Sequence, residues 1–180
     1  MIVAGLVPHE LDAAMYYFAY GSNMLTRRLT AAARGPSARA IAVGKLLGRQ
    51  LQFHKVGLDG SGKCDAELTE CATDVVHGVL FEMSRADKLA LDRLECAAGG
   101  YASQDVRIEL TDDIALATTY VAQRTQRGLK PFHWYKALVV AGALEHRLPA
   151  DYLAALRAVA SVDDPDDERR LQHEALLGSR

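Results

Sequence analysis

A short segment near the N-terminus combines residue types that can bind an anion. The aromatic run Tyr17-Phe18-Ala19-Tyr20 changes abruptly into Gly21-Ser22-Asn23, and a helical pattern begins at Met24. A strand that turns through such residues into a helix directs several backbone N–H groups into one small space, which suits a carboxylate or an oxyanion. An ordinary corner capped by Ser22 or Asn23 is the alternative, and the segment alone leaves it open.

Glu95 is the second residue of chemical interest. It ends the amphipathic pattern Leu91-Asp92-Arg93-Leu94-Glu95, so it falls in the last turn of an expected helix. The negative end of the helix dipole disfavours a charged carboxylate there. A carboxyl group whose charged form is disfavoured can hold and release a proton near neutral pH, as a general acid/base must. The alternative is a solvated surface glutamate paired with Lys88 or Arg93.

Two tyrosines are further candidates for the wall of a site. Tyr101 follows the turn Gly99-Gly100, and Tyr135 lies early in the helix expected after Pro131. A tyrosine hydroxyl can hold an amine or a carboxylate at the edge of an apolar pocket, although half-buried packing is the simpler interpretation of each residue. The sequence contains no persuasive Ser–His–Asp or Cys–His set for nucleophilic catalysis.

Composition excludes several classes of function. The chain has 180 residues, 49% of them hydrophobic, with a net charge of −2. Its basic residues are scattered, so nucleic acid is not an expected partner, and no apolar run approaches the roughly 20 residues that span a bilayer. The three cysteines include no Cys-x-x-Cys pair, which favours a reducing cytoplasm. The histidines show no metal-ligand spacing, so we expect no metal and no cofactor.

The element pattern predicts an α+β fold with a small mixed β-sheet or barrel and surrounding helices. Strands are expected at 15–20, 38–47, 50–55, 66–69, 75–82, 104–110 and 114–122. Helices are expected at 24–33, 84–95, 132–146, 151–160 and 166–177. The glycine-rich stretch 57–63 is expected to be a loop, and its spacing does not fit a phosphate-binding loop.

Length and composition predict one folded domain with an extension at each end. Residues 1–14 form a loosely held N-terminal extension, residues 15–160 form a single domain, and residues 161–180 form a C-terminal helical tail.

The chain resembles the γ-glutamylcyclotransferase family from about residue 15 to residue 160. The matching segments occur in the family's order: Tyr17-Phe18-Ala19-Tyr20-Gly21-Ser22-Asn23, Gly78-Val79-Leu80-Phe81-Glu82-Met83, Leu91-Asp92-Arg93-Leu94-Glu95, Tyr101, Tyr135-Lys136, Gly142-Ala143 and Leu148-Pro149-Ala150-Asp151-Tyr152. The resemblance implies that Glu95 is catalytic. It also implies that the substrate is bound by Tyr20, Gly21, Ser22, Asn23, Met24, Tyr101 and Tyr135. One departure is Cys96, which follows the glutamate where the family usually has glycine.

The activity implied by the resemblance is an intramolecular cyclisation. A γ-glutamyl compound, the expected small-molecule partner, would release 5-oxoproline and an amino acid or amine. Two alternatives remain: a non-catalytic ligand-binding or regulatory module on the same fold, and a sister enzyme acting on γ-glutamyl-amines. The expected protein is a monomer or a homodimer with no membrane association.

Overall fold

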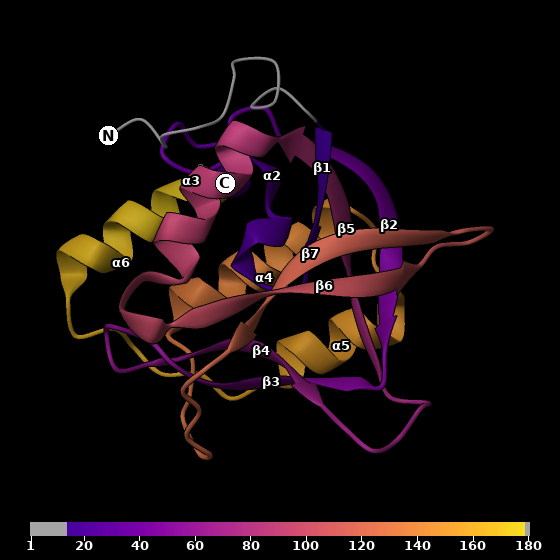
Figure 1. The fold of residues 1–180 in the computed structure, drawn as a ribbon. Helices are drawn as coiled ribbons and strands as arrows, with labels where there is room; N and C mark the ends of the chain where they lie inside the picture. Colours follow the sequence, from indigo (N-terminus) through magenta and orange to yellow (C-terminus); the bar gives the residue numbers. More distant parts are fainter. Residues whose placement is uncertain (1–13, 179–180) are drawn as a thin grey trace.

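Five strands close into a barrel in the order β1-β5-β2-β6-β7 in the computed structural model, which describes residues 14–178 (Figure 1). These strands are β1 (Ala14–Ala19), β2 (Arg39–Leu47), β5 (Val75–Ser84), β6 (Tyr101–Glu109) and β7 (Ile114–Ala122). β1 runs parallel to β7, and the other neighbouring pairs are antiparallel. Strands β3 (Arg49–Val56) and β4 (Gly62–Leu68) form a separate two-stranded sheet. The expected α+β fold with a mixed barrel is therefore confirmed.

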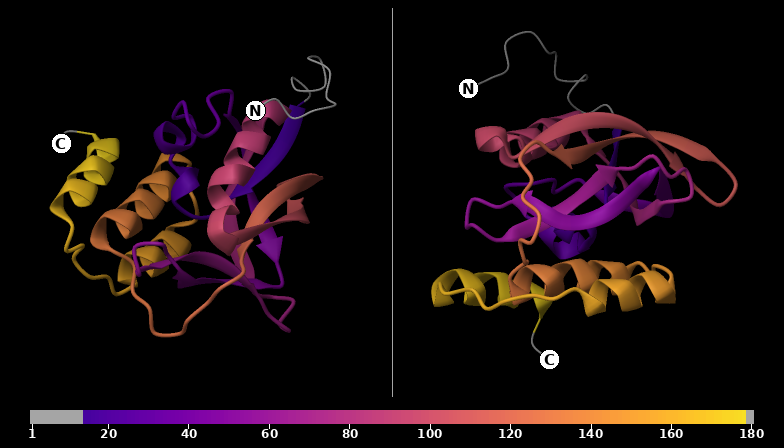
Figure 2. Two further views of the ribbon diagram at one scale, coloured as in Figure 1. Left: turned by 60° about the vertical axis from the view of Figure 1, so that its left-hand side comes forward. Right: turned by 90° about the horizontal axis from the view of Figure 1, so that it is seen from below.

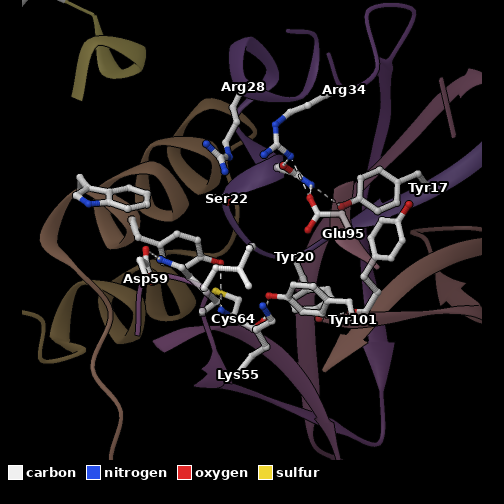
Figure 3. Close-up of a pocket in the computed structure, with 18 of the residues that line it drawn as sticks. Tyr17, Tyr20, Ser22, Arg28, Arg34, Lys55, Asp59, Cys64, Glu95 and Tyr101 are labelled. Carbon is white, nitrogen blue, oxygen red and sulfur yellow. Dashed lines mark hydrogen bonds and ion pairs between the residues drawn. The ribbon is translucent and has the colours of Figure 1, made fainter. Parts of the chain in front are cut away.

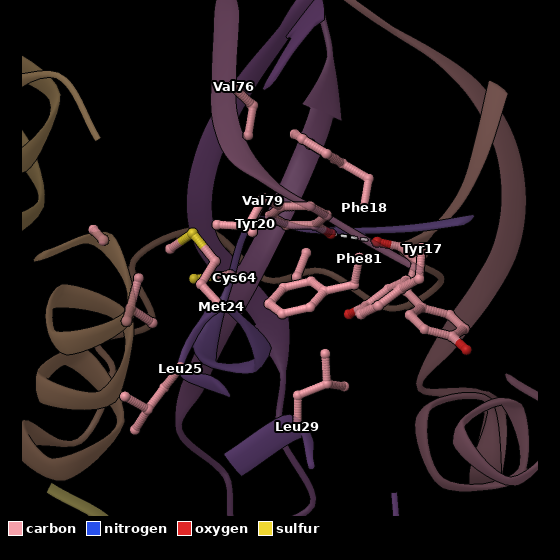
Figure 4. Packing of buried hydrophobic residues seen from close by; sticks show 14 of the residues in the cluster. Tyr17, Phe18, Tyr20, Met24, Leu25, Leu29, Cys64, Val76, Val79 and Phe81 are labelled. Atoms are coloured by element: carbon pink, nitrogen blue, oxygen red, sulfur yellow. Dashed lines mark hydrogen bonds between the residues drawn. The ribbon is translucent and has the colours of Figure 1, made fainter. Parts of the chain in front are cut away.

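Side chains from β1 and β5 fill the hydrophobic core on both faces of these strands. Phe18 of β1 and Phe81 of β5 are fully buried, as are Leu80 and Val79 to within 1% (Figure 4). The two strands pair with Phe18 opposite Leu80. Burying aromatic and β-branched side chains on a pleated surface is what favours strand formation here, so the apolar runs in the sequence identify both strands correctly.

The helices lie on two sides of the strands (Figure 2). The short N-terminal segments are η1 (Ser22–Met24) and α2 (Thr26–Leu29), followed later by α3 (Arg85–Glu95), η2 (Ala97–Gly99), α4 (His133–Glu145), α5 (Ala150–Ala158), α6 (Asp167–Glu174) and η3 (Ala175–Leu177). Helices α4, α5 and α6 form one layer, and α3 lies on the other side (Figure 2). No helix within residues 14–178 is both long enough and apolar enough to cross a membrane.

Helix α4 packs directly on the corner formed by η1. A Cβ atom on Gly142 would lie 2.5 Å from the backbone nitrogen of Leu25 and 2.7 Å from Met24 Cβ. Glycine is therefore required for this close approach, which holds the corner against a long helix. Met24 and Leu25 are buried beside it.

The structure corrects three details of the expected elements. The helix expected at 24–33 is divided into η1 and α2, because Leu25 has an extended backbone with ψ of 110°. Strand β4 begins at Gly62, inside the expected loop, because Gly62 pairs with Val56 of β3. Strand β6 begins at Tyr101, three residues before the expected start at Gln104.

The division of the chain into three parts stays a prediction. The expected extension at 1–14 falls almost entirely outside the described residues, and β1 already begins at Ala14. Within the expected tail at 161–180, Asp164 accepts a hydrogen bond of 2.7 Å from the indole nitrogen of Trp134, so this part of the chain is in contact with α4.

Candidate active site

A cavity of about 460 Å³ opens beside the corner that follows β1 (Figure 3). Its wall combines residues from β1, η1, α2, the β3–β4 sheet, α3, β6, β7, α4 and α6. Of the predicted site residues, Tyr20, Gly21, Ser22, Asn23, Glu95, Tyr101 and Tyr135 line this cavity. Residues that lie up to 115 positions apart in the sequence are thus brought to one place.

Glu95 is held at the corner by two hydrogen bonds to the same oxygen. Its Oε1 accepts from Asn23 Nδ2 at 3.0 Å and from Arg34 Nη1 at 3.0 Å. Arg34 Nη1 also donates to Asn23 Oδ1 at 3.1 Å, and Asn23 Nδ2 donates to Tyr17 Oη at 3.1 Å. Because Asn23 uses its donor and its acceptor in these contacts, its amide orientation is fixed.

The second oxygen of Glu95, Oε2, accepts no hydrogen bond from residues 14–178. The Glu95 side chain is 19% exposed, and Figure 3 shows its carboxylate at the cavity wall. The helix end disfavours the negative charge of Glu95, whereas the Arg34 guanidinium favours it. Sequence reasoning identified only the first of these two effects.

The end of α3 fixes where Glu95 points. Ser84 caps the helix by accepting from the Asp87 N–H at 3.2 Å. Cys96 adopts an ordinary helical conformation with φ of −87°, so cysteine is not strained at this position. The left-handed residue that the turn requires is Gly99, with φ of +66°.

The corner itself offers free backbone donors. Ser22 and Asn23 open η1, and the first N–H groups of a helix have no intrahelical acceptor. The N–H of Met24, in contrast, donates to the Gly21 carbonyl at 3.0 Å. The Met24 side chain is fully buried in the core and does not line the cavity. Within the part of the chain described, the structure therefore brings Ser22 and Asn23 to the cavity, but not Met24.

Tyr101 and Tyr135 fix a residue of β4 that sequence reasoning did not connect with the site. Tyr101 Oη donates to the Cys64 carbonyl at 2.7 Å, and Tyr135 Oη accepts from the Cys64 N–H at 3.1 Å. The Tyr135 hydroxyl keeps its own proton for another acceptor. Burial raises the pKa of both tyrosines well above the ordinary value. Tyr20 donates to the Tyr120 carbonyl, which fixes β1 against β7.

Gly21 packs closely against Cys64 in the cavity wall. A Cβ atom on Gly21 would lie 3.1 Å from Cys64 Cβ and 3.4 Å from Tyr135 Oη. Burial raises the pKa of the Cys64 thiol to about 12. Cys64 is therefore a small packing residue in its protonated form rather than a thiolate nucleophile.

The cavity carries more positive than negative side chains. Its cations are Arg28, Arg34, Lys55, Lys63 and Arg169, and its carboxylates are Asp59 and Glu95. Lys63 donates to Asp59 at 2.7 Å and lies 4.6 Å from the ring centres of Trp134 and Tyr135. Burial raises the Asp59 pKa, but the hydrogen bond and charge of Lys63 more than offset this, so the net shift is downward.

Comparisons with known proteins agree with this architecture. A model of the AIG2-like family matches residues 75–156. Human γ-glutamylcyclotransferase is 28% identical over 160 residues, which cover 84% of this chain and 82% of the human protein. The bovine γ-glutamylcyclotransferase is 28% identical over 155 residues, covering 82% of this chain and 79% of the relative.

Solved structures match most of the chain. A structure of a γ-glutamyl cyclotransferase superposes with a TM-score of 0.79 at 25% identity, covering 91% of this chain and 99% of the other. A crystal structure of an uncharacterised human protein superposes with a TM-score of 0.80 at 26% identity, covering 92% and 99%. The barrel and its cavity define an enzyme of the γ-glutamylcyclotransferase fold. In both sequence and fold, the chain is similar to γ-glutamylcyclotransferases.

Sequence reasoning missed the basic residues and Cys64. Arg28 follows the corner by only a few positions, in Leu25-Thr26-Arg27-Arg28. The sequence alone does not reveal which of the two neighbouring arginines faces the cavity. Arg34 comes 11 positions after Asn23, beyond the short helix α2. Lys63 was assigned to a flexible loop, and the early start of β4 is what places it in the wall.

Proposed function

We propose that this enzyme cyclises γ-glutamyl compounds and releases 5-oxoproline together with an amino acid or amine. The observation that carries the proposal is the 3.0 Å contact between Glu95 Oε1 and Asn23 Nδ2 inside the cavity. It supports a single small site that contains an acid/base group next to a corner of backbone donors. The related proteins named γ-glutamylcyclotransferase support the same reaction.

The reaction balances within one substrate molecule. The α-amino nitrogen attacks the γ-carbonyl carbon, a new C–N bond closes the five-membered lactam, and the C–N bond to the leaving group breaks. One proton leaves the α-ammonium group and one proton is needed by the leaving nitrogen. Because nucleophile and electrophile belong to the same molecule, much of the entropic cost of bringing them together is already met.

Glu95 is our candidate for moving both protons. Oε1 is held by Asn23 and Arg34, whereas Oε2 accepts no hydrogen bond from residues 14–178. Oε2 would take the proton of the α-ammonium group and then give it to the departing nitrogen. A carboxylate fixed through one oxygen keeps the other in a defined position, which such a transfer requires.

The N–H groups of Ser22 and Asn23 are our candidates for stabilising the oxyanion on the γ-carbon. They begin η1 without intrahelical acceptors, and both residues are 7% exposed at the cavity wall. Preorganised donors of this kind stabilise the tetrahedral intermediate more than the planar carbonyl. Tyr135 can donate its free proton to the bound substrate.

The experiment is an assay with γ-glutamyl-alanine and the purified protein. We expect 5-oxoproline and alanine to form in equal amounts. Release of glutamate instead of 5-oxoproline would indicate hydrolysis by water. Binding of γ-glutamyl-alanine without any product would favour the non-catalytic module. A cytoplasmic location stays a prediction from the three free cysteines, Cys64, Cys71 and Cys96.

A further inference from the structure

Arg28 lines the cavity without an acceptor for its guanidinium group. Its side chain makes no hydrogen bond and no ion pair with residues 14–178, and its Nε is buried without a partner. Burial is the main reason that the pKa of Arg28 falls to about 10. Leaving a buried charge without a partner destabilises a protein, so a structure that retains one commonly uses it to bind something.

The other cations of the cavity are already in contact with protein groups. Arg34 donates to Glu95 at 3.0 Å, Lys63 donates to Asp59 at 2.7 Å, and Arg169 donates to Asp164 at 2.7 Å. The Lys55 ammonium group lies 4.7 Å from the ring centre of Tyr101. Arg28 is thus the cavity cation whose side chain makes no hydrogen bond, ion pair or cation–π contact with the described part of the chain.

Figure 3 shows the side chains of Arg28 and Glu95 on the same side of the cavity. Both side chains point inward, with Arg34 between them and Glu95 bound to Arg34 and Asn23. Arg34 already uses Nη1 to donate to Glu95 and Asn23, whereas no N–H group of the Arg28 side chain donates to a described residue, so Arg28 can give a planar pair of N–H groups to a further carboxylate.

We propose that Arg28 binds a carboxylate of the substrate. The inference rests on the proposed function, since it concerns ligands of the same cavity. A γ-glutamyl amino acid carries two carboxylates: one on the α-carbon of the glutamyl group and one on the leaving amino acid. A γ-glutamyl-amine carries only the first. The identity of the carboxylate at Arg28 therefore decides whether Arg28 recognises every γ-glutamyl compound or selects those that release an amino acid.

The test compares two substrates and two variants. γ-Glutamyl-alanine and γ-glutamyl-ethylamine differ only in the leaving-group carboxylate. Arg28→Gln removes the cavity guanidinium, and Arg27→Gln removes the neighbouring arginine, which is exposed on the same short helix. Arg28→Lys keeps the charge but loses the planar pair of donors, so partial recovery is expected.

Two results would support the proposal and identify the carboxylate. If Arg28 binds the leaving amino acid, Arg28→Gln lowers kcat/KM roughly 10- to 100-fold for γ-glutamyl-alanine and leaves γ-glutamyl-ethylamine unchanged. If Arg28 binds the glutamyl group, both substrates lose activity by the same factor. In that second case Arg28→Gln also loses affinity for 5-oxoproline, while 2-pyrrolidinone, the same ring without the carboxylate, binds weakly to every variant.

The thermal stability of the Arg28→Gln variant distinguishes a ligand-binding role of Arg28 from a structural role. We expect the melting temperature of unliganded Arg28→Gln to equal or exceed that of Arg27→Gln, because the substitution removes a partly buried charge that has no protein partner. A lower melting temperature, or kinetics of Arg28→Gln equal to those of Arg27→Gln on both substrates, would overturn the proposal.

Failure of the proposed function gives a different pattern. In that case the wild-type protein forms no 5-oxoproline from either substrate. Binding of glutarate, a dicarboxylate probe, by thermal shift then decides the inference alone. Stabilisation of the wild type and of Arg27→Gln but not of Arg28→Gln supports it, and equal behaviour of all three proteins overturns it.

Discussion

Glu95 and Arg28 line the same cavity, but their surroundings are opposite. Glu95 is bound by Asn23 and Arg34, each at 3.0 Å from Oε1. The Arg28 side chain makes no hydrogen bond with the described residues. The difference separates a group that must hold one orientation before the substrate arrives from a group whose partner is the substrate itself. Fixed geometry favours proton transfer, whereas an unpaired charge favours binding.

The largest effect is expected from removing the candidate acid/base group, the Glu95 carboxylate. Glu95→Gln keeps the shape and the hydrogen-bonding capacity of the side chain but cannot exchange a proton. Loss of a positioned acid/base lowers the rate by ~10²–10⁴. We expect this loss in kcat for 5-oxoproline release, with an unchanged circular dichroism spectrum.

Glu109→Gln is the matched control for that experiment. Glu109 is exposed on β6 and lies outside the cavity. Its kcat should equal that of the wild type. Equal activity of Glu95→Gln and Glu109→Gln would remove Glu95 from the mechanism and with it the contrast between Glu95 and Arg28.

A smaller effect on ligand affinity is expected from substitution of Gly21. In Gly21→Val, the added side chain would begin 3.1 Å from Cys64 Cβ and 3.4 Å from Tyr135 Oη. Overpacking of this kind costs about 1–3 kcal/mol, so we expect a loss of roughly 10- to 100-fold in affinity for 5-oxoproline. Calorimetric titration measures it, and Ala40→Val, at an exposed position of β2 outside the cavity, serves as the control. An unchanged affinity would show that the ligand does not approach Gly21.

Arg34→Met tests whether the fixed orientation of Glu95 matters. The substitution removes the guanidinium that donates to Glu95 and to Asn23. Loss of one charge-assisted hydrogen bond corresponds to about 1.5–3 kcal/mol, and exposure of the pair reduces this, so a loss of about tenfold in kcat is expected. A fall in affinity with unchanged kcat would instead assign Arg34 to substrate binding, together with Arg28.

The smallest effect concerns stability at high pH. The pKa of Cys64 is raised from 9.0 to about 12 by burial. Between these values the unfolded chain has lost the thiol proton and the folded chain retains it, so the free energy of unfolding falls as pH rises. One such group contributes a slope of up to about 1.4 kcal/mol per pH unit.

Urea unfolding of Cys64→Ala and of the wild type at pH 8, 9.5 and 10.5 measures that contribution. We expect a shallower decline for Cys64→Ala. Cys71→Ala, at an exposed cysteine, should follow the wild type. Parallel declines in all three proteins would show that the Cys64 thiol ionises as freely as in the unfolded chain.

The fold and half of the cavity follow from local patterns in the sequence. The aromatic run before Gly21 predicts β1, and the Ser84 cap with Leu91 predicts α3, because period and capping are properties of a few neighbouring residues. These two elements carry the corner and Glu95. Their meeting depends on the β1–β5 pairing, which local patterns do not encode.

The cationic half of the cavity could not be predicted in the same way. Arg27 and Arg28 are adjacent and chemically identical, yet one is exposed and the other lines the cavity. The difference arises from the two-part geometry of η1 and α2, in which Leu25 has an extended backbone. Lys63 and Cys64 reach the wall through hydrogen bonds from Gly62 to Lys130 and from Cys64 to Tyr135, which are tertiary contacts.

A crystal structure of Glu95→Gln soaked with γ-glutamyl-alanine tests the central claim most directly, because the substitution should preserve the bound substrate. We expect the α-amino nitrogen within about 3 Å of the residue 95 side chain, the γ-carbonyl oxygen at the Ser22 and Asn23 N–H groups, and a carboxylate at Arg28. Density for the ligand outside this cavity, or an α-amino nitrogen turned away from residue 95, would contradict the account.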